Sequence, residues 1–396
     1  MLAAIPTARY QTSVHPIFAA TPRQILRHAS LDMLASRVVA EFDAAPCAVV
    51  ACAWRSNGSW VVAQGAAGHA WPHGPAVSPD CPFDLASVTK PFSALALARL
   101  VHRGMLDLST PLGVLVQETI GTPSSKIPLE LLLAHRSGLD GHRPLYAPLA
   151  RGSRVHVYEA LQQASCARRQ DCSGEPPAQG FAPTYSDLGY LLLGEAIARA
   201  SALALDRTIH SEVCQPLGLQ VDSARRWRRR DPSFDAVVVP TEVVDWRGGA
   251  VRGAVHDENA WALGGDGMCA HAGLFGTARD VASLGGAVLD VLGGRIDAWL
   301  RPQDIEPLLR VRAGGTLRAG FDGKSQGASS AGEVCSDGTF GHLGFTGTSL
   351  WIDPHAETVA VLLSNRVHPT RANDAIKKAR PVIHDALFRF AAGRGE

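Results

Sequence analysis

Ser87 and Lys90 are the residues whose types and spacing point most directly to chemistry. They make up the one S-x-x-K pattern in the sequence. A spacing of three residues places both side chains on one face of a helix. A lysine that is partly removed from water can lose its proton near neutral pH and activate the serine hydroxyl as a nucleophile. The pair therefore predicts acyl transfer through a serine.

The same two residues also fit a structural alternative, in which Ser87 caps a helix and the Lys90 side chain is exposed to water. The chain has only five lysines against 33 arginines, so a lysine at this place is less easily explained by composition. The helix should begin at about Ser87, because Pro91 has no N–H and fits only the first turn. Apolar residues then recur at helical spacing up to Gly104, a typical residue after a helix end.

Tyr185, Ser186 and Asp187 form the only Tyr-x-Asp or Tyr-x-Asn pattern in a chain with five tyrosines. A tyrosine at a loop end facing Lys90 could exchange protons with it. Cationic or desolvating neighbours would then hold the phenol partly ionised. The alternative is a helix start in which Ser186 or Asp187 caps the helix and Tyr185 serves for packing.

The third pattern is the glycine-rich stretch 340–348, which contains His342 and Gly344. Glycine in a strand lets the backbone approach a ligand closely, so we expect Gly344 to contact substrate. The N–H of Phe345 could join that of Ser87 as an oxyanion hole. His342 would then lie beside the nucleophile and donate a hydrogen bond to substrate. By itself the stretch also fits a plain turn before a strand.

The composition is that of a globular protein. The chain has 396 residues, 46% of them hydrophobic, and a net charge of +1, so no overall field favours nucleic acid as a partner. The one basic cluster, residues 225–230, is predicted to be a loop in water. No apolar run reaches the roughly 18 residues of a transmembrane helix. Residues 1–20 lack the pattern of a signal peptide, so we expect a cytoplasmic protein, or a periplasmic one if the true N-terminus differs.

The eight cysteines are scattered and form no C-x-x-C pair. Zinc is therefore not expected, and we expect no metal or organic cofactor. Cys166 and Cys172 flank a polar loop and could form a disulfide in an exported protein. Without a visible signal peptide, free thiols are favoured.

The spacing of apolar residues predicts an α+β protein. Asn57-Gly58 between two apolar runs indicates a β-hairpin. Thr277 and Asp280 resemble a capping box, which predicts a helix to about residue 292. Strands are expected near both chain ends, and helices flank them, at the following residues: strands 47–54, 60–66, 348–352 and 358–363; helices 30–43, 187–200 and 371–391.

Strands near both ends of the chain suggest a single antiparallel sheet with helices on either side, an α/β/α sandwich. We predict that residues 29–105 and 275–396 form this sheet domain. Residues 106–274 would be an inserted, mainly helical lobe, and residues 1–28 an irregular extension.

Taken together and in order, the three patterns resemble the serine β-lactamase and penicillin-binding-protein superfamily, closest to its class C-like branch of DD-peptidases and esterases. Segments 131–139, 181–194 and 270–280 resemble further parts of that family. The resemblance covers roughly residues 30–391. It implies the β-lactamase/transpeptidase-like fold.

Two departures bear on the substrate. The third pattern reads His-Leu-Gly, where penicillinases and peptidases usually have Lys-Thr-Gly or Lys-Ser-Gly. The lysine charge helps to hold a substrate carboxylate, and Leu343 offers no hydroxyl. Asp187 stands where asparagine is common and would slightly disfavour anionic substrates. Both departures weaken the case for an efficient β-lactamase.

The resemblance implies catalysis through a covalent serine ester. Ser87 would attack an ester or amide carbonyl, with Lys90 and Tyr185 accepting its proton. The N–H groups of Ser87 and Phe345 would stabilise the oxyanion. Tyr185, helped by His342, would then activate water for deacylation.

The expected substrate contacts are Asp187, Gly344 and Asn259. Asn259 is also expected to line the site with Trp261 and the loop 264–273, because these residues are polar or glycine-rich. The first functional hypothesis is a serine hydrolase that acts on a small carboxylic ester or a D-amino-acid peptide. The alternatives are a β-lactamase and, from another class, a penicillin-recognising sensor that is acylated without turnover. The sequence assigns no oligomeric state.

Overall fold

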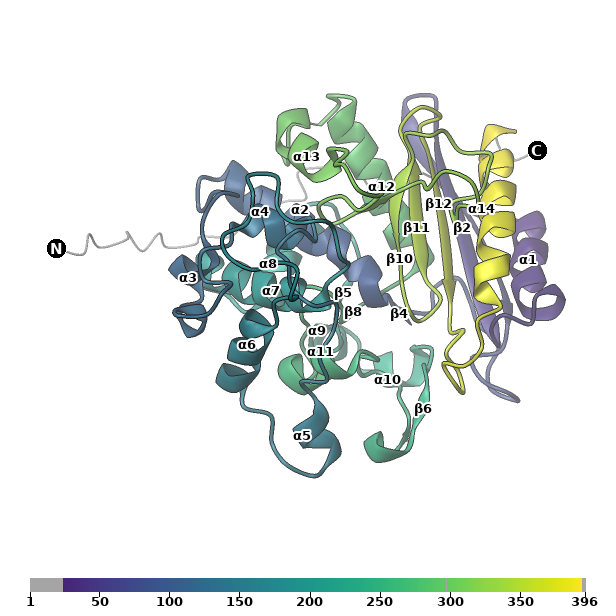
Figure 1. Ribbon diagram of the computed structural model, residues 1–396. Coiled ribbons are helices and arrows are strands. Elements are labelled where there is room, and N and C mark those ends of the chain that lie inside the picture. The colour runs from purple at the N-terminus through teal and green to yellow at the C-terminus, as the bar shows by residue number, and fades with distance from the viewer. Residues whose placement is uncertain (1–23, 297, 394–396) are drawn as a thin grey trace.

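The main sheet is built from strands near both ends of the chain. The structure is a computed structural model that describes residues 24–296 and 298–393 (Figure 1). Seven strands lie in the order β1-β3-β2-β12-β11-β10-β9. Only β1 pairs in parallel, with β3. The strands are β1 (Gln24–Arg27), β2 (Cys47–Ser56), β3 (Ser59–Gly68), β9 (Asp322–Gly323), β10 (Phe340–Leu343), β11 (Ser349–Asp353) and β12 (Thr358–Ser364).

The tight turn between β2 and β3 has the chemistry that its sequence predicts. Asn57 and Gly58 both have positive φ, 48° and 77°, as a two-residue hairpin turn of the right twist requires. The ladder then runs from the pair Ser56 and Ser59 to the pair Cys47 and Gly68. The predicted hairpin is confirmed.

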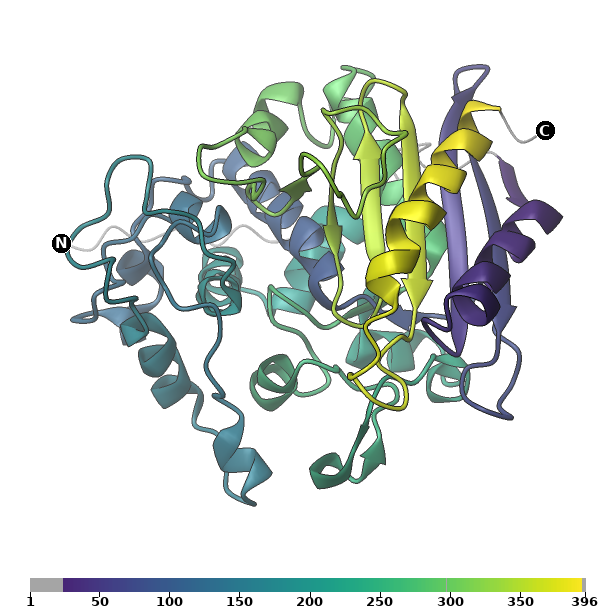
Figure 2. The ribbon, with the colours of Figure 1, turned by 45° about the vertical axis from the view of Figure 1, so that its right-hand side comes forward.

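Helices cover both faces of this sheet (Figure 2). Helix α12 (Ala278–Leu292) packs on one face, while α1 (Ala29–Ser36) and α14 (Ile376–Ala392) pack on the other. Side chains of β2 alternate between the two cores because successive residues of a strand point to opposite faces: Val49 joins the α12 side and Val50 the α1 and α14 side. The predicted α/β/α sandwich is confirmed.

The helix that carries Ser87 and Lys90 is α2 (Thr89–His102), preceded by a 3₁₀ turn, η2 (Ala86–Val88). The expected start at Ser87 is thus within two residues of the start of α2. Although α2 falls in the predicted sheet domain, it packs mainly against helices α7, α8 and α13 and the π-helical turn η4. Its place between the two halves of the molecule is visible in Figure 1.

The middle of the chain is mainly helical but also contains short strands. β4 (Phe83–Asp84), β5 (Asp222–Ser223) and β8 (Leu274–Gly276) form a small sheet in the order β4-β8-β5. This sheet joins the predicted lobe to the start of the nucleophile segment.

The remaining elements are π-helical η1 (Arg37–Glu41); α3 (Leu112–Leu115), η3 (Gln117–Thr119), α4 (Leu129–Leu133), α5 (Ala147–Ala150), α6 (Val157–Cys166), α7 (Asp187–Ser201), α8 (Leu205–Ile209), η4 (His210–Cys214), α9 (Ala224–Arg230), α10 (Phe234–Val237), β6 (Val243–Val244), η5 (Asp245–Arg247), β7 (Gly249–Ala250), α11 (Glu258–Gly264) and α13 (Pro302–Leu309).

Two expectations need correction. Most of the predicted extension lies outside the described residues, but Gln24–Arg27 form strand β1, because the exposed edge of β3 offers backbone partners. The basic cluster is not a loop: it forms helix α9. Neighbouring carboxylates balance its charge, since Arg225 and Arg226 pair with Asp206 and Asp222, both at 2.8 Å.

All eight cysteines are free thiols; Cys172 is buried and Cys166 exposed. In the described part of the chain, no single helix is both long and apolar enough to cross a membrane. One bent pair, Asp187–Ser201 with Leu205–Cys214, meets the test of length and composition.

Candidate active site

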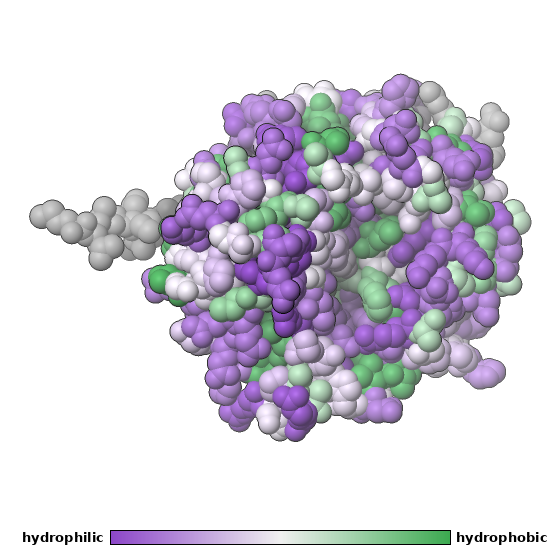
Figure 3. All heavy atoms as spheres, in the orientation of Figure 1, coloured by the Kyte–Doolittle hydropathy of each residue, from purple (hydrophilic) through white to green (hydrophobic). Residues whose placement is uncertain are grey.

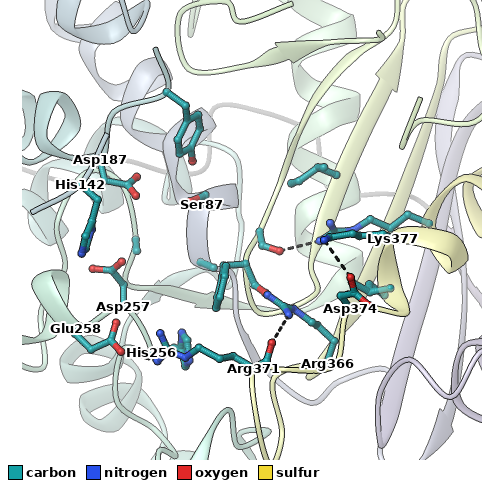
Figure 4. Close-up of a pocket in the computed structure, with 18 of the residues that line it drawn as sticks. Ser87, His142, Asp187, His256, Asp257, Glu258, Arg366, Arg371, Asp374 and Lys377 are labelled. Atoms are coloured by element: carbon teal, nitrogen blue, oxygen red, sulfur yellow. Dashed lines mark hydrogen bonds and ion pairs between the residues drawn. The ribbon is translucent and has the colours of Figure 1, made fainter. Parts of the chain in front are cut away.

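A cavity of ≈ 710 Å³ opens between the helical half and the sheet half, above Ser87. The face drawn in Figure 3 is hollowed in this region. In Figure 4, Asp187, Asp257 and Glu258 lie on one side of Ser87, and Arg366, Arg371 and Lys377, together with Asp374, lie on the other. The cavity is lined by Ala86, Ser87, His142, Tyr146, Tyr185, Asp187, His256, Asp257, Glu258, Ala272, Leu343, Gly344, Phe345, Arg366, Arg371, Asp374, Ile376, Lys377 and Arg380.

The backbone around Ser87 is held in an uncommon conformation. Ala86 has φ of 47°, in the left-handed region that a residue with a Cβ rarely adopts. Its N–H donates to Asp84 Oδ1 at 2.8 Å, and Thr348 Oγ1 donates to the Leu85 carbonyl at 2.9 Å. These contacts fix the turn that presents the half-buried Ser87 to the cavity.

Lys90 is completely buried below Ser87. Its Nζ donates to Ser87 Oγ at 3.0 Å, to Asp187 Oδ1 at 2.7 Å and to the His271 carbonyl at 3.4 Å. Burial lowers the pKa of Lys90, because the low-dielectric surroundings disfavour the ammonium, and Asp187 partly opposes this shift. The geometry therefore suits a lysine that gives up its proton more readily than a lysine in water.

Tyr185 lies beside both Ser87 and Lys90. Lys90 Nζ is 4.7 Å from the centre of its ring, and its phenol hydrogen bonds with Ser87. About a third of the residue, 36%, remains open to solvent. Burial of the phenol raises the pKa of Tyr185 well above its usual value, and Asp187 adds to this. The expectation of a partly ionised phenol is therefore corrected: the surroundings favour the protonated form.

His135 supports Tyr185, a role that the sequence did not reveal. Its ring stacks on the Tyr185 ring with centroids 4.7 Å apart, and its Nδ1 accepts a hydrogen bond from the Ser186 N–H at 3.0 Å. Burial lowers the pKa of His135 well below its usual value, so the ring is neutral and can accept. The only sequence signal was its place in the segment 131–139.

His342 is brought close to Tyr185 but does not line the cavity. Its ring centre is 6.0 Å from that of Tyr185, and its Nδ1–H donates to the Leu343 carbonyl at 2.8 Å. Burial lowers the pKa of His342 to about 3. Of the residues around it, Leu343, Gly344 and Phe345 face the cavity instead.

Gly344 is required by close packing. A Cβ at this position would lie 1.9 Å from Thr348 Oγ1 and 2.7 Å from the Leu85 carbonyl oxygen. The strand end therefore approaches the turn before Ser87 directly. Within the described residues, neither the Ser87 N–H nor the Phe345 N–H donates to a protein acceptor. Both residues line the cavity, as a pair of oxyanion donors would.

Two arginines that the sequence analysis did not single out hold the third pattern in place. Arg366 Nε donates to the Phe345 carbonyl at 2.7 Å. Arg380 Nη2 donates to the carbonyls of Gly344 and Thr348 at 2.8 and 2.9 Å. Both come from the segment after β12, so their role depends on how that segment folds back over β10.

Asn259 does not contact the cavity, contrary to the expected substrate contact. The side chain is buried, donates to the Arg143 carbonyl at 2.8 Å and accepts from the Tyr146 N–H at 3.1 Å. Its neighbour Asp257 lines the cavity and lies 3.0 Å from His271 Nε2. Burial by itself would raise the pKa of Asp257. The neighbouring His271 and the hydrogen bonds to the carboxylate outweigh this effect, so the pKa is lowered.

In the part of the chain that the structure describes, no group of three or more His, Cys, Asp or Glu side chains is arranged to hold a metal ion. Ser87 of η2, Lys90 of α2 and Tyr185 before α7 come together at the site.

Comparison with known proteins identifies the family of the chain. The family model described as Beta-lactamase matches residues 35–382. A candidate D-alanyl-D-alanine carboxypeptidase of Salmonella agona is 28% identical over 313 residues, covering 74% of this chain and 71% of the relative.

Solved structures show the same fold. The hydrolase EstCE1, described as having promiscuous acyltransferase activity, covers 90% of this chain and 97% of its own at a TM-score of 0.67 and 19% identity. A penicillin-binding-protein homologue from Caulobacter crescentus covers 90% of this chain and 96% of its own at a TM-score of 0.64 and 20% identity. Since the family model spans most of the residues described here, the chain belongs to the beta-lactamase family and is a hydrolase of that superfamily.

Proposed function

We propose that this protein is a serine hydrolase that works through a covalent acyl-enzyme formed on Ser87. The observation that carries the proposal is the position of Lys90, which is fully buried with Nζ 3.0 Å from Ser87 Oγ. A desolvated amine at hydrogen-bond distance from a hydroxyl is the arrangement that a general base needs.

The proton moves between Ser87, Lys90 and Tyr185. As Ser87 Oγ attacks the carbonyl carbon, its proton passes to Lys90, and the N–H groups of Ser87 and Phe345 stabilise the oxyanion. When the tetrahedral intermediate collapses, the bond to the leaving alcohol or amine breaks and the leaving group takes a proton through the Tyr185 phenol. The raised pKa of Tyr185 suits a proton relay, and the lowered pKa of Lys90 suits a base.

Deacylation uses the same groups in reverse. Water attacks the acyl carbon, its proton passes through Tyr185 to Lys90, and the ester bond to Ser87 Oγ breaks as that oxygen regains a proton. The products are a carboxylic acid and the free enzyme. Burial lowers the pKa of His342 to about 3, which makes it a weak base at neutral pH, so we infer that it supports Tyr185 by contact.

The proposed substrate is a small carboxylic ester or a D-amino-acid peptide. The Salmonella relative and EstCE1 bear names of both kinds, a carboxypeptidase and a hydrolase with acyltransferase activity. Leu343 faces the cavity where a hydroxyl-bearing residue would help to bind a substrate carboxylate, and this favours a neutral ester over a β-lactam. We propose a cytoplasmic location; separation of cell fractions followed by immunoblotting tests it, because a peptidoglycan substrate would require export.

The test is adduct formation and turnover. The protein is incubated separately with a fluorophosphonate, a penicillin and p-nitrophenyl butyrate, and intact mass, peptide mapping and product release are followed. We expect a Ser87 adduct with the fluorophosphonate and turnover of the ester. Absence of any Ser87 adduct in folded protein would refute the proposal.

The same experiment separates the alternatives. Rapid penicillin turnover would indicate a β-lactamase, and a stable penicillin adduct without any turnover would indicate a sensor. Ser87→Ala is the control, and we expect it to lose activity while its thermal midpoint stays close to that of the wild type, since Ser87 lies half-buried at an open cavity.

A further inference from the structure

Two segments project beside the cavity at its rim. One carries α5 and the residues before it, and the other is the hairpin β6–β7; both extend from the same edge of the molecule in two views (Figures 1 and 2). Tyr146 immediately precedes α5, and Trp246 lies in η5 between β6 and β7. Their rings stack with centroids 5.7 Å apart and planes 8° from parallel.

A third aromatic ring extends this contact. Trp261 of α11 lies 5.8 Å from Trp246, measured between ring centroids. The guanidinium of Arg247 lies 4.1 Å from the Trp261 ring centre and donates through Nη1 to the His256 carbonyl at 3.1 Å. The hairpin is therefore fastened to α11, and Trp246 remains 37% exposed. We refer to Tyr146, Trp246 and Trp261 as the aromatic shelf.

Buried contacts fix the position of the shelf relative to the catalytic groups. Asn259 is 1% exposed and holds the Arg143 carbonyl and the Tyr146 N–H with its amide. Asp257 caps α11 by accepting from the Ala260 N–H at 2.8 Å. Both Asp257 and Tyr146 line the cavity that contains Ser87. The shelf is thus continuous with the site.

The opposite wall of the cavity combines charged and apolar side chains. Its basic side chains attract polar or anionic groups. The wall includes Arg366, Arg371, Lys377 and Arg380, the acidic Asp374, and the apolar Leu343, Phe345 and Ile376. Aromatic rings, in contrast, gain by stacking on flat apolar surfaces. The stacked rings on the side of Tyr146 therefore offer an apolar part of a substrate a flat surface away from these charges.

We propose that the aromatic shelf binds an aromatic or bulky apolar substituent of the substrate and so sets the substrate preference. The proposal rests on the proposed function, because the shelf acts on substrates whose reacting carbonyl lies at Ser87. It assigns to Asn259 a positioning role through Tyr146.

The test compares three esters that differ by one ring: methyl acetate, methyl phenylacetate with the ring on the acyl side, and benzyl acetate with the ring on the leaving side. Acid release is followed at constant pH in wild type, Tyr146→Ala, Trp246→Ala and Trp246→Leu, the last retaining apolar bulk. The matched control is Tyr158→Ala, an exposed tyrosine on α6. We expect the kcat/KM ratio of at least one ring-bearing ester over methyl acetate to fall about tenfold in the shelf variants and to persist in the control. Unchanged ratios for both ring-bearing esters would overturn the proposal.

A binding measurement distinguishes failure of the shelf proposal from failure of the proposed hydrolase function. In a Ser87→Ala background, tryptophan fluorescence is titrated with N-phenylacetyl-D-alanine and with N-acetyl-D-alanine. We expect a saturable change with the phenylacetyl compound at a concentration at least fivefold lower, and its loss when Trp246 is also replaced by alanine. Failure of every ester to react would count against the hydrolase, whereas equal binding of the two compounds would count against the shelf.

Discussion

Lys90 lies between the residue that it would activate and the carboxylate that holds its charge. Its Nζ is 2.7 Å from Asp187 Oδ1 and 3.0 Å from Ser87 Oγ. Asp187 stabilises the ammonium and so works against the burial that lowers the pKa of Lys90. Lys90 acts as a base only after losing its proton. We therefore expect kcat/KM to rise as the pH increases past the lowered pKa of Lys90.

Replacing Asp187 by Asn should move that rise to lower pH. Without the carboxylate, the protonated lysine loses its main electrostatic support, and its pKa falls further. The measurement is kcat/KM for a neutral ester between pH 5 and 10. Asp171→Asn, at an exposed carboxylate of a surface loop, is the control. A shift toward higher pH would contradict this role of Asp187.

Tyr185 and Tyr190 offer a matched pair of phenylalanine substitutions, since their rings lie 4.7 and 5.3 Å from Lys90 Nζ. Tyr185→Phe keeps the ring but removes the proposed proton relay, so kcat should fall by about 10²–10⁴-fold. Tyr190→Phe removes a buried hydrogen bond from its hydroxyl to the Leu133 carbonyl. It should lower the free energy of unfolding by about 1 kcal/mol while kcat stays close to wild type. Equal losses of kcat in both variants would argue against a special role for Tyr185.

Leu343→Thr should raise penicillin turnover relative to ester turnover. Leu343 faces the cavity, and a threonine there would place a hydroxyl where the β-lactam carboxylate can accept a hydrogen bond. One hydrogen bond to a charged group contributes about 1.5–3 kcal/mol, so the expected gain is roughly 10- to 100-fold. Leu343→Val has the shape of threonine without the hydroxyl and is the control. A gain of the same size with valine would show that shape, not hydrogen bonding, is responsible.

Acid should destabilise the fold through its buried histidines. His384 is fully buried, with Nδ1–H donating to the Ser330 carbonyl at 2.5 Å and Nε2 accepting from Ser349 Oγ at 2.8 Å. Burial lowers the pKa values of His384 and His342 to about 3, from 6.5. Between these values the unfolded chain binds more protons, so stability falls as pH drops below 6.5, by about 1.4 kcal/mol per pH unit for each histidine.

Urea unfolding at pH 7.5, 6.5, 5.5 and 4.5 measures this slope. His384→Gln should flatten it, because glutamine cannot take up the proton, even if the variant is less stable at neutral pH. The exposed His355, replaced by glutamine, is the control. An unchanged slope in His384→Gln would contradict the assignment.

Local chemistry made several features predictable. Asn57-Gly58 required a hairpin, Thr277 began α12 at the expected place, and the spacing of Ser87 and Lys90 put both side chains on one helix face. Each depends on contacts within a few residues, which the order of residues alone specifies.

Other features followed from long-range packing. Arg226 pairs with Asp222, only four positions before it, but the carboxylate that pairs with Arg225 is that of Asp206, 19 positions away. Asn259 is polar, as a site residue would be, yet its amide is hydrogen bonded to Arg143 and Tyr146, 116 and 113 positions away.

The sequence by itself determined the chemistry of the site: a serine and a lysine one turn apart, a tyrosine before a helix and a glycine-rich strand. Tertiary structure decided how those groups are poised. The contact between Lys90 and Asp187 joins residues 97 positions apart. The stacking of His135 on Tyr185 and the burial that separates the pKa values of Tyr185 and Lys90 exist only when α2, α4 and α7 pack together. Desolvation and distance are properties of that packing, and the pKa of a side chain depends on both.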